Sequence, residues 1–232
     1  MAINAHTGSR YADALQDLRQ AVLEMGGLSE EGLATALEAL HEGDESLAER
    51  SRTIDVEINR LEREIGEQCI RLLALHQPVA SDLRFVTMAM RLATDLERVG
   101  DLAKNVARRA GQLSRREHVV PVSTLPAMGR RVRQMMASAL DAFVERDVDL
   151  AWDVLRRDDE VDGMHWALLA ELERAMMQSP ELVPAALRLL FIVKDLERVA
   201  DHATNIAEGV IFLVHGRDVR HRRNEGSGPG GA

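Results

Sequence analysis

One stretch of this sequence occurs twice, and it constrains the fold more than any other feature. Residues 95–107 read DLERVGDLAKNVA and residues 195–207 read DLERVADHATNIA, so the copies lie one hundred residues apart and agree at most positions. Recurrence at a fixed separation is typical of chains built from repeated structural units. Apolar residues recur in each copy at helical spacing. The chain is therefore expected to contain two related helices in two related halves.

The match between the halves extends beyond the doubled motif. A shift of 103 residues aligns Asp44 with Asp147 and Asp55 with Asp158. In each half, breaks at glycine, proline or aspartate separate three helical segments, and short connections make successive helices antiparallel. The expected helices span about 9–42, 45–76, 79–115, 127–145, 148–178 and 181–215.

These segments predict an all-α fold of two pseudo-symmetric, antiparallel three-helix bundles. The first bundle is expected over residues 9–116 and the second over 124–216, with a linker at 117–126. Residues 217–232 are expected to be a disordered tail, because a glycine-rich and polar segment cannot form a core.

Two local features qualify the predicted helices. Gly26 and Gly27 are expected to kink or split the first helix, because each glycine costs about 1 kcal/mol relative to alanine inside a helix. Pro78 is expected in the first turn of the third helix, where its missing N–H does no harm.

Composition supports a helical fold and excludes several classes of function. Hydrophobic residues make up 46% of the chain and aromatic residues only 3%, so the core must be aliphatic, which favours helices. The net charge of −9 argues against binding to nucleic acid. The start lacks the features of a signal peptide and the apolar runs are too short to span a membrane, so we expect a cytoplasmic protein without membrane insertion. The single cysteine, Cys69, is expected to be a buried, reduced thiol.

The doubled motif places oxygen-bearing side chains along one side of each helix. Each copy has a glutamate, an aspartate and an asparagine at four-residue intervals: Glu97, Asp101 and Asn105 in the first copy, and Glu197, Asp201 and Asn205 in the second. On a helical wheel these positions lie away from the apolar side of the helix, so they avoid the core of their own bundle. Such oxygens are hard ligands suited to Mg, Ca, Mn or Fe. A single copy fits an ordinary solvated helix face, but its repetition favours a metal-binding or partner-binding role.

Other catalytic and metal-binding patterns are not met. A ferritin-like di-iron site needs Glu-x-x-His steps on two helices. Glu38 with His41 is one such step, and the second half does not repeat it. His202 is expected to be an exposed histidine rather than an additional ligand. The sequence has no glycine-rich phosphate loop, zinc-type cluster or nucleophile elbow, which argues against an enzyme.

Three segments carry a family resemblance. They are the doubled Glu-Arg-Val-(Gly/Ala)-Asp motif, QPVASDLR at 77–84 and IFLVHGRDVRH at 211–221. Together, and in this order, they resemble the PhoU family of regulators associated with the phosphate-specific transport system, over nearly the whole chain. The resemblance implies two three-helix bundles, usually in a homodimer. It also implies a cytoplasmic negative regulator of phosphate uptake and starvation signalling, which contacts a sensor histidine kinase and the ATPase of a phosphate ABC transporter.

The resemblance further implies where metal ions bind. The acidic motif of the family, Glu or Asp followed four residues later by Asp, binds metal clusters in some members. It falls here on Glu97 with Asp101 and on Glu197 with Asp201. The supporting candidates are Asn105, Asn205, Asp55, Asp158 and Asp162. The ion, divalent or trivalent, stays open among Fe, Mn, Mg and Zn, because oxygen ligands alone permit several.

The two copies of the motif also differ from each other. The first has Gly100 and Leu102 where the second has Ala200 and His202, so the two sites are expected to differ in affinity or nuclearity. Two alternative functions stay open at this point. One is a metal-dependent enzyme that uses the same carboxylates, and the other is an accessory protein of a different phosphate transporter.

Overall fold

The structure, a computed structural model, describes residues 2–113, 120, 122–216 and 219, with side chains from residue 10 onward. The described chain is helical apart from its turns and connections. Its elements are α1 (Ala2–Glu42), α2 (Glu45–His76), α3 (Ala80–Gly111), α4 (Leu125–Glu145), α5 (Val148–Gln178), the short 3₁₀ helix η2 (Pro180–Leu182) and α6 (Val183–His215).

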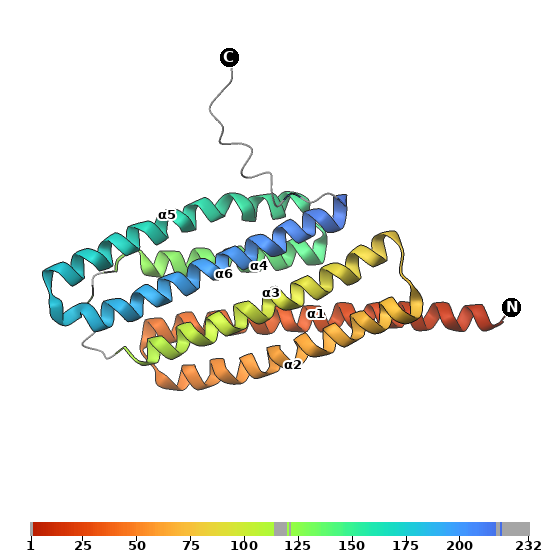
Figure 1. The fold of residues 1–232 in the computed structure, drawn as a ribbon, viewed down its shortest axis with the longest axis horizontal. Coiled ribbons are helices and arrows are strands. Elements are labelled where there is room, and N and C mark those ends of the chain that lie inside the picture. Colours follow the sequence, from red (N-terminus) through yellow and green to blue (C-terminus); the bar gives the residue numbers. More distant parts are fainter. Residues whose placement is uncertain (1, 114–119, 121, 217–218, 220–232) are drawn as a thin grey trace, which may run out of the picture.

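The helices form two antiparallel three-helix bundles, as the sequence predicts. Helices α1, α2 and α3 pack on one another in the first bundle, and α4, α5 and α6 form the second. Figure 1 shows the bundles side by side, with α3 and α6 facing each other at the centre. Helix α1 also contacts α4, so the bundles have a second interface beside the one between α3 and α6. The two copies of the motif therefore lie on the paired central helices.

Equivalent turns join the first two helices of each bundle. The turn after α1 has Gly43 in the left-handed region at φ 65°, and the Asp44 carboxylate then accepts a hydrogen bond from the Ser46 amide at 2.8 Å. The turn after α4 has Arg146 at φ 56°, and Asp147 accepts from the Leu150 amide at 2.9 Å. Both aspartates cap the helix that follows, as the 103-residue alignment predicts.

Two local predictions are wrong. Helix α1 runs unbroken through Gly26 and Gly27, because close packing of Gly26 on α4 outweighs the cost of glycine. A Cβ at Gly26 would lie 3.2 Å from Leu140 Cδ2, so a larger residue would crowd this contact. Pro78 lies outside α3, which begins at Ala80 with Val79 as its N-cap.

The ends of the predicted segments shift by a few residues. Helix α4 begins at Leu125 and includes Pro126 in its first turn, where the sequence predicts a start at residue 127. Helix α3 ends at Gly111, four residues before the expected end. Parts of the expected linker, residues 117–119 and 121, and all of the expected tail except Val219 lie outside the described residues.

The core along α3 and α6 is mainly aliphatic, with Phe85 as a buried aromatic residue of α3. Val99, Ala103 and Val106 of the first motif are at most 1% exposed, which confirms the apolar side of the predicted helix. Cys69 is buried, as expected, and burial raises the pKa of its thiol to about 11. Within the described residues, no helix is both long and apolar enough to cross a membrane.

Candidate functional site

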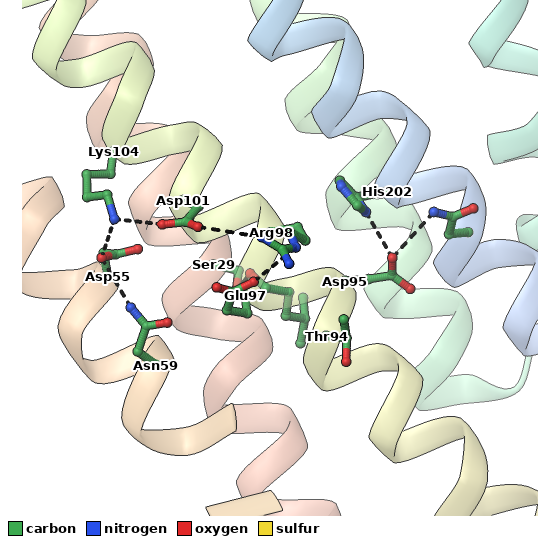
Figure 2. Close-up of polar contacts among 12 residues, drawn as sticks. Ser29, Asp55, Asn59, Thr94, Asp95, Glu97, Arg98, Asp101, Lys104 and His202 are labelled. Carbon is green, nitrogen blue, oxygen red and sulfur yellow. Dashed lines mark hydrogen bonds and ion pairs between the residues drawn. The ribbon is translucent and has the colours of Figure 1, made fainter. Parts of the chain in front are cut away.

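The first motif carries its carboxylates on a face that α3 shares with α2. Figure 2 shows Asp55 of α2 opposite Asp101 of α3, with Lys104 between them. The Lys104 Nζ atom lies 2.7 Å from Asp55 Oδ2 and 2.6 Å from Asp101 Oδ1. Burial alone would lower the pKa of Lys104, but the hydrogen bonds to both carboxylates raise it above its usual value. The first acidic stripe, defined as Glu97, Asp101 and Asp55, thus carries a cation of the chain itself.

Asp55 is the most buried member of the first acidic stripe. Only 5% of the residue is exposed, and the Asn59 amide donates to its Oδ2 atom at 3.3 Å. Its Oδ1 atom is buried without a hydrogen-bond partner in the described structure. A buried carboxylate is stable only when its charge is compensated, so Lys104 holds this site together.

Glu97 lies further along the same face. Its side chain is 22% exposed and contacts the Arg98 guanidinium at 3.4 Å. Burial and the neighbouring Asp101 raise the pKa of Glu97 above its usual value. Asn105 lies one turn beyond Asp101, where it accepts a long contact of 3.5 Å from Arg108.

The second acidic stripe, defined as Glu197, Asp201, Asp158 and Asp162, has no lysine at the equivalent place. Position 204 is a threonine, and its hydroxyl donates to the Asp201 backbone oxygen at 2.7 Å. Asp158, the counterpart of Asp55, is 7% exposed. Asp201 lies at the open edge of this group, yet burial, then Glu197 and Asp158, raise the pKa of Asp201 to about 6. The second stripe therefore repeats the three carboxylates of the first and lacks its lysine. It also has Asp162, where the first half has Asn59.

The two stripes fit a metal ion to different degrees. In the first, the Lys104 ammonium stands between two carboxylates that would serve as ligands. In the second, several oxygens gather without an ammonium, which suits a hard cation. No group of three or more His, Cys, Asp or Glu side chains is arranged to hold a metal ion in the part of the chain that the structure describes. The first stripe does not fit an ion beside its lysine. The second has suitable donors near one another, although in the described residues they do not surround a single point where an ion would lie.

A second set of contacts, on the other side of the motif helices, joins the two bundles. Asp95 of α3 lies 2.9 Å from His202 Nδ1 of α6 (Figure 2). The Asn205 amide donates to the same carboxylate at 3.4 Å. In the mirrored position, Asp195 of α6 pairs with Arg109 of α3. The aspartate that opens each copy of the motif thus contacts the opposite bundle.

These contacts correct two sequence-based assignments. His202 is not an exposed histidine, since only 16% of its side chain is exposed and it contacts Asp95. Asn205 points across the α3–α6 interface toward Asp95 rather than toward the second acidic stripe. Sequence reasoning missed Lys104 and Asp95. The signals were available: Asp95 is repeated as Asp195, and position 104 is one where the copies differ in charge.

Two cavities bear on the enzyme alternative. One of about 550 Å³ is mainly apolar and lies between α1, α4 and the segment that joins the bundles, beside Leu37 and Leu125. The other, of about 310 Å³, lies between α3 and α6 beside Asp95 and Asn205. Neither cavity is lined by Glu97, Asp101, Glu197 or Asp201.

Comparisons with known proteins agree with this architecture. The PhoU domain model matches the chain twice, over residues 22–110 and 125–210. The phosphate-specific transport system accessory protein PhoU homolog of Pseudomonas aeruginosa is 42% identical over 221 residues, which cover 95% of this chain and 91% of that protein. The corresponding Escherichia coli K12 protein is 35% identical and covers 94% of this chain and 91% of its own length. The crystal structure of PhoU from Pseudomonas aeruginosa has a TM-score of 0.85 at 42% identity, covering 89% of this chain and all of that one. With both halves and most of the length matched in sequence and in fold, this chain belongs to the PhoU family.

Proposed function

We propose that this protein is an accessory protein of a phosphate-specific transport system, and that it acts in the cytoplasm as a negative regulator of phosphate uptake and phosphate-starvation signalling. The observation that supports this most strongly is the match over most of the chain to relatives named for that system. The same names favour this system over a different phosphate transporter. The duplicated domain supports it as well.

The proposed mode of action is contact rather than catalysis. The protein would be an adaptor between the ATPase of the phosphate ABC transporter and a sensor histidine kinase. The six long helices of the described residues offer extended surfaces for two partners. The carboxylates that an enzyme would use line neither of the two cavities described above, so no observation here favours the enzyme alternative.

Affinity capture from the native host tests the adaptor role. The tagged protein is expected to recover the transporter ATPase and the sensor kinase when phosphate is plentiful, and a deletion strain is expected to express starvation genes under that condition. The control is the same capture with tag alone. Recovery of neither partner at high or low phosphate, together with unchanged repression in the deletion strain, would contradict the proposal.

We further propose that a metal ion binds at the second acidic stripe. Glu197 and Asp201 would hold it, with the oxygens of Asp158 and Asp162 as further donors. Two observations support this choice: these carboxylates gather on one face, and Thr204 stands where the first stripe has Lys104. When bound, the ion would supply positive charge to an acidic face of α6. The candidates are Fe, Mn, Mg and Zn, because hard oxygen ligands accept each of them.

Matched alanine pairs separate the two stripes. We expect the Glu197→Ala/Asp201→Ala variant to lose its bound metal, measured by elemental mass spectrometry after equilibration with each ion. The control is Glu97→Ala/Asp101→Ala, which makes the same change in the stripe that holds Lys104 and should keep its metal. Equal metal in the native protein and in the variant with all four changes would refute metal binding. Loss in the control alone would place the ion at the first stripe instead.

A further inference from the structure

The interface between the two bundles has an aspartate on each side, and in the described structure only one of them pairs with an arginine. Asp195 of α6 is the counterpart of Asp95 of α3 at a shift of one hundred residues. The Asp195 Oδ2 atom pairs with the Arg109 guanidinium, which also lies over the Phe191 ring. At the same shift, the residue equivalent to Arg109 is Gly209. An arginine side chain on one side of the interface is therefore missing on the other.

The cavity between α3 and α6 lies at the place of the missing side chain. The contact equivalent to that of Arg109 with Asp195 would join position 209 to Asp95. Both Gly209 and Asp95 line this cavity, whose volume is about 310 Å³. Met88 takes part of the space beside the glycine, since a Cβ at position 209 would overlap its thioether. The volume that is left falls in the range of small-molecule sites, about 300–1,000 Å³.

One oxygen of Asp95 is available to a ligand in this cavity. His202 and the Asn205 amide both contact its Oδ1 atom, at 2.9 Å and 3.4 Å. Figure 2 shows the second oxygen of Asp95 pointing away from His202, and no hydrogen bond from the described residues reaches it. Its counterpart in Asp195 is the atom that binds Arg109. Because the Asp95 side chain is only 19% exposed, a charged hydrogen bond here would be partly shielded from water.

The remaining lining of the cavity suits a guanidinium group. Phe212 contributes an aromatic ring, as Phe191 does beside Arg109. Glu208 contributes a second carboxylate. Aromatic rings and carboxylates both attract a guanidinium group. Arg91 also lines the cavity, is exposed, and forms no ion pair with a described residue, so it can meet an anionic group of the same ligand.

We propose that this cavity binds a guanidinium group supplied from outside the chain, with Asp95 Oδ2 as its main acceptor. The bound group takes the place that Arg109 has on the other side of the interface. Its source is free arginine or an arginine side chain of a partner protein. Because the cavity lies between α3 and α6, the ligand adds contacts between the two bundles. This inference does not depend on the role in phosphate signalling, because it uses no residue of either acidic stripe.

Two compounds of the same shape test the proposal on the whole protein at constant ionic strength. Propylguanidine copies the end of an arginine side chain, and propylurea is its uncharged analogue. In a nuclear magnetic resonance titration, propylguanidine is expected to bind saturably at millimolar concentration, and propylurea is not. Asp95→Asn should raise the dissociation constant about tenfold or more, because it removes a charged acceptor. The matched control is Asp195→Asn, which makes the same change beside Arg109 and should keep the native constant.

A second variant keeps the proposal testable if Asp95→Asn does not fold, which circular dichroism would show. Gly209→Arg combined with Met88→Ala copies the other side of the interface, because the new arginine can occupy the cavity and pair with Asp95. We expect this variant to bind no propylguanidine and to melt at a higher temperature than Met88→Ala alone. A lower melting temperature together with undiminished binding of propylguanidine would overturn the proposal.

The source of the guanidinium group follows from a comparison of L-arginine with its N-acetyl amide. Tighter binding of L-arginine, lost in Arg91→Gln, supports free arginine as the ligand. Tighter binding of the amide supports an arginine side chain in a partner protein. Absence of saturable binding by all three guanidinium compounds would overturn the proposal. Equal binding of propylurea would also overturn it, as would an equal loss of affinity in Asp95→Asn and in folded Asp195→Asn.

Discussion

Lys104 shows how much one residue changes the chemistry of the motif. The carboxylates are repeated between the halves, and their positions on the helical wheel could be read from the sequence. The ammonium between Asp55 and Asp101 could not, because it depends on how α2 and α3 pack. The difference between Lys104 and Thr204 is visible in the sequence, but its meaning needs the distance to a carboxylate on another helix.

Removal of this lysine should destabilise the first bundle. Lys104→Thr, which copies the second motif, leaves the buried Asp55 without its cationic partner and with only the Asn59 amide as a donor. Loss of one partner from a fully buried pair costs about 3–5 kcal/mol. Because Lys104 is 30% exposed, we expect a smaller loss, about 1–3 kcal/mol, in urea unfolding at neutral pH. Asp55→Asn in the same background should recover part of it. Unchanged stability in Lys104→Thr would show that solvent already compensates Asp55.

Tyr11 provides a pH-dependent reporter, because it is the single tyrosine of the chain. Burial and its hydrogen bond to Asp82, 2.9 Å long, raise the pKa of the phenol to about 12. Since the folded pKa lies above the unfolded value of about 10, the associated stability is present below pH 10 and is lost as the pH rises toward 12. Absorbance at 295 nm should report ionisation of the phenol at unusually high pH, and Asp82→Asn should shift this ionisation to lower pH. A native midpoint near 10 would contradict the packing of Tyr11.

At the scale of elements, the two motif helices solve the same packing problem with different side chains. Gly100 of α3 leaves room for Ile58 of α2, whose Cδ1 would lie 2.8 Å from a Cβ at position 100. In the second half the equivalents are Ala200 and Val161. Valine lacks the Cδ1 atom that crowds position 100, so an alanine fits where the first half needs glycine. This compensation accounts for one of the differences between the two copies.

A double-mutant cycle tests the compensation. Gly100→Ala alone should destabilise the protein by about 1–3 kcal/mol, the usual cost of overpacking a close contact. Ile58→Val alone should cost about 0.5–1.5 kcal/mol. In combination the two should be less costly than their sum, because together they reproduce the residues of the second half. Additive costs, measured by urea unfolding, would mean that positions 58 and 100 do not compensate.

Sequence patterns located the elements well and their packing less well. Aspartate caps and left-handed turns are local signals, so the turns at residues 43–44 and 146–147 could be predicted. The continuity of α1 through Gly26 and Gly27 could not, because the contact with Leu140 comes from the other bundle. The pairing of Asp95 with His202 was missed for the same reason, since 107 residues separate them in the chain.

At the scale of the whole molecule, the α3–α6 interface joins the bundles through polar contacts as well as a shared core. Asp195 is 8% exposed and pairs with Arg109, whose guanidinium carbon also lies 5.3 Å from the centroid of the Phe191 ring. Burial raises the pKa of Asp195, although Arg109 acts in the opposite direction. The two halves are therefore expected to unfold together.

Arg109→Met tests this coupling. Without the guanidinium, we expect the pKa of Asp195 to rise further above its unfolded value. The charged form is then disfavoured in the folded state, so the variant loses most stability at neutral and higher pH and regains part of it as the pH falls toward 4. The difference in melting temperature between variant and native protein, taken at several pH values, measures this loss of stability. A difference that does not change with pH would assign the effect to lost packing rather than to charge.

The placement of Asp95 and Asp195 helps to explain why residues 95–107 and 195–207 are so similar in sequence. One side of each motif helix fills its own core, a second meets the sister bundle, and a third carries carboxylates beside α2 or α5. A substitution almost anywhere in these thirteen residues disturbs at least one of the three. After a duplication, a helix with one packed side can accept many substitutions, so the two copies diverge in sequence. A helix that makes contacts on three sides accepts few, so its two copies stay alike. Contacts on three sides of the helix are thus enough to account for the repeated sequence, whether or not an ion binds.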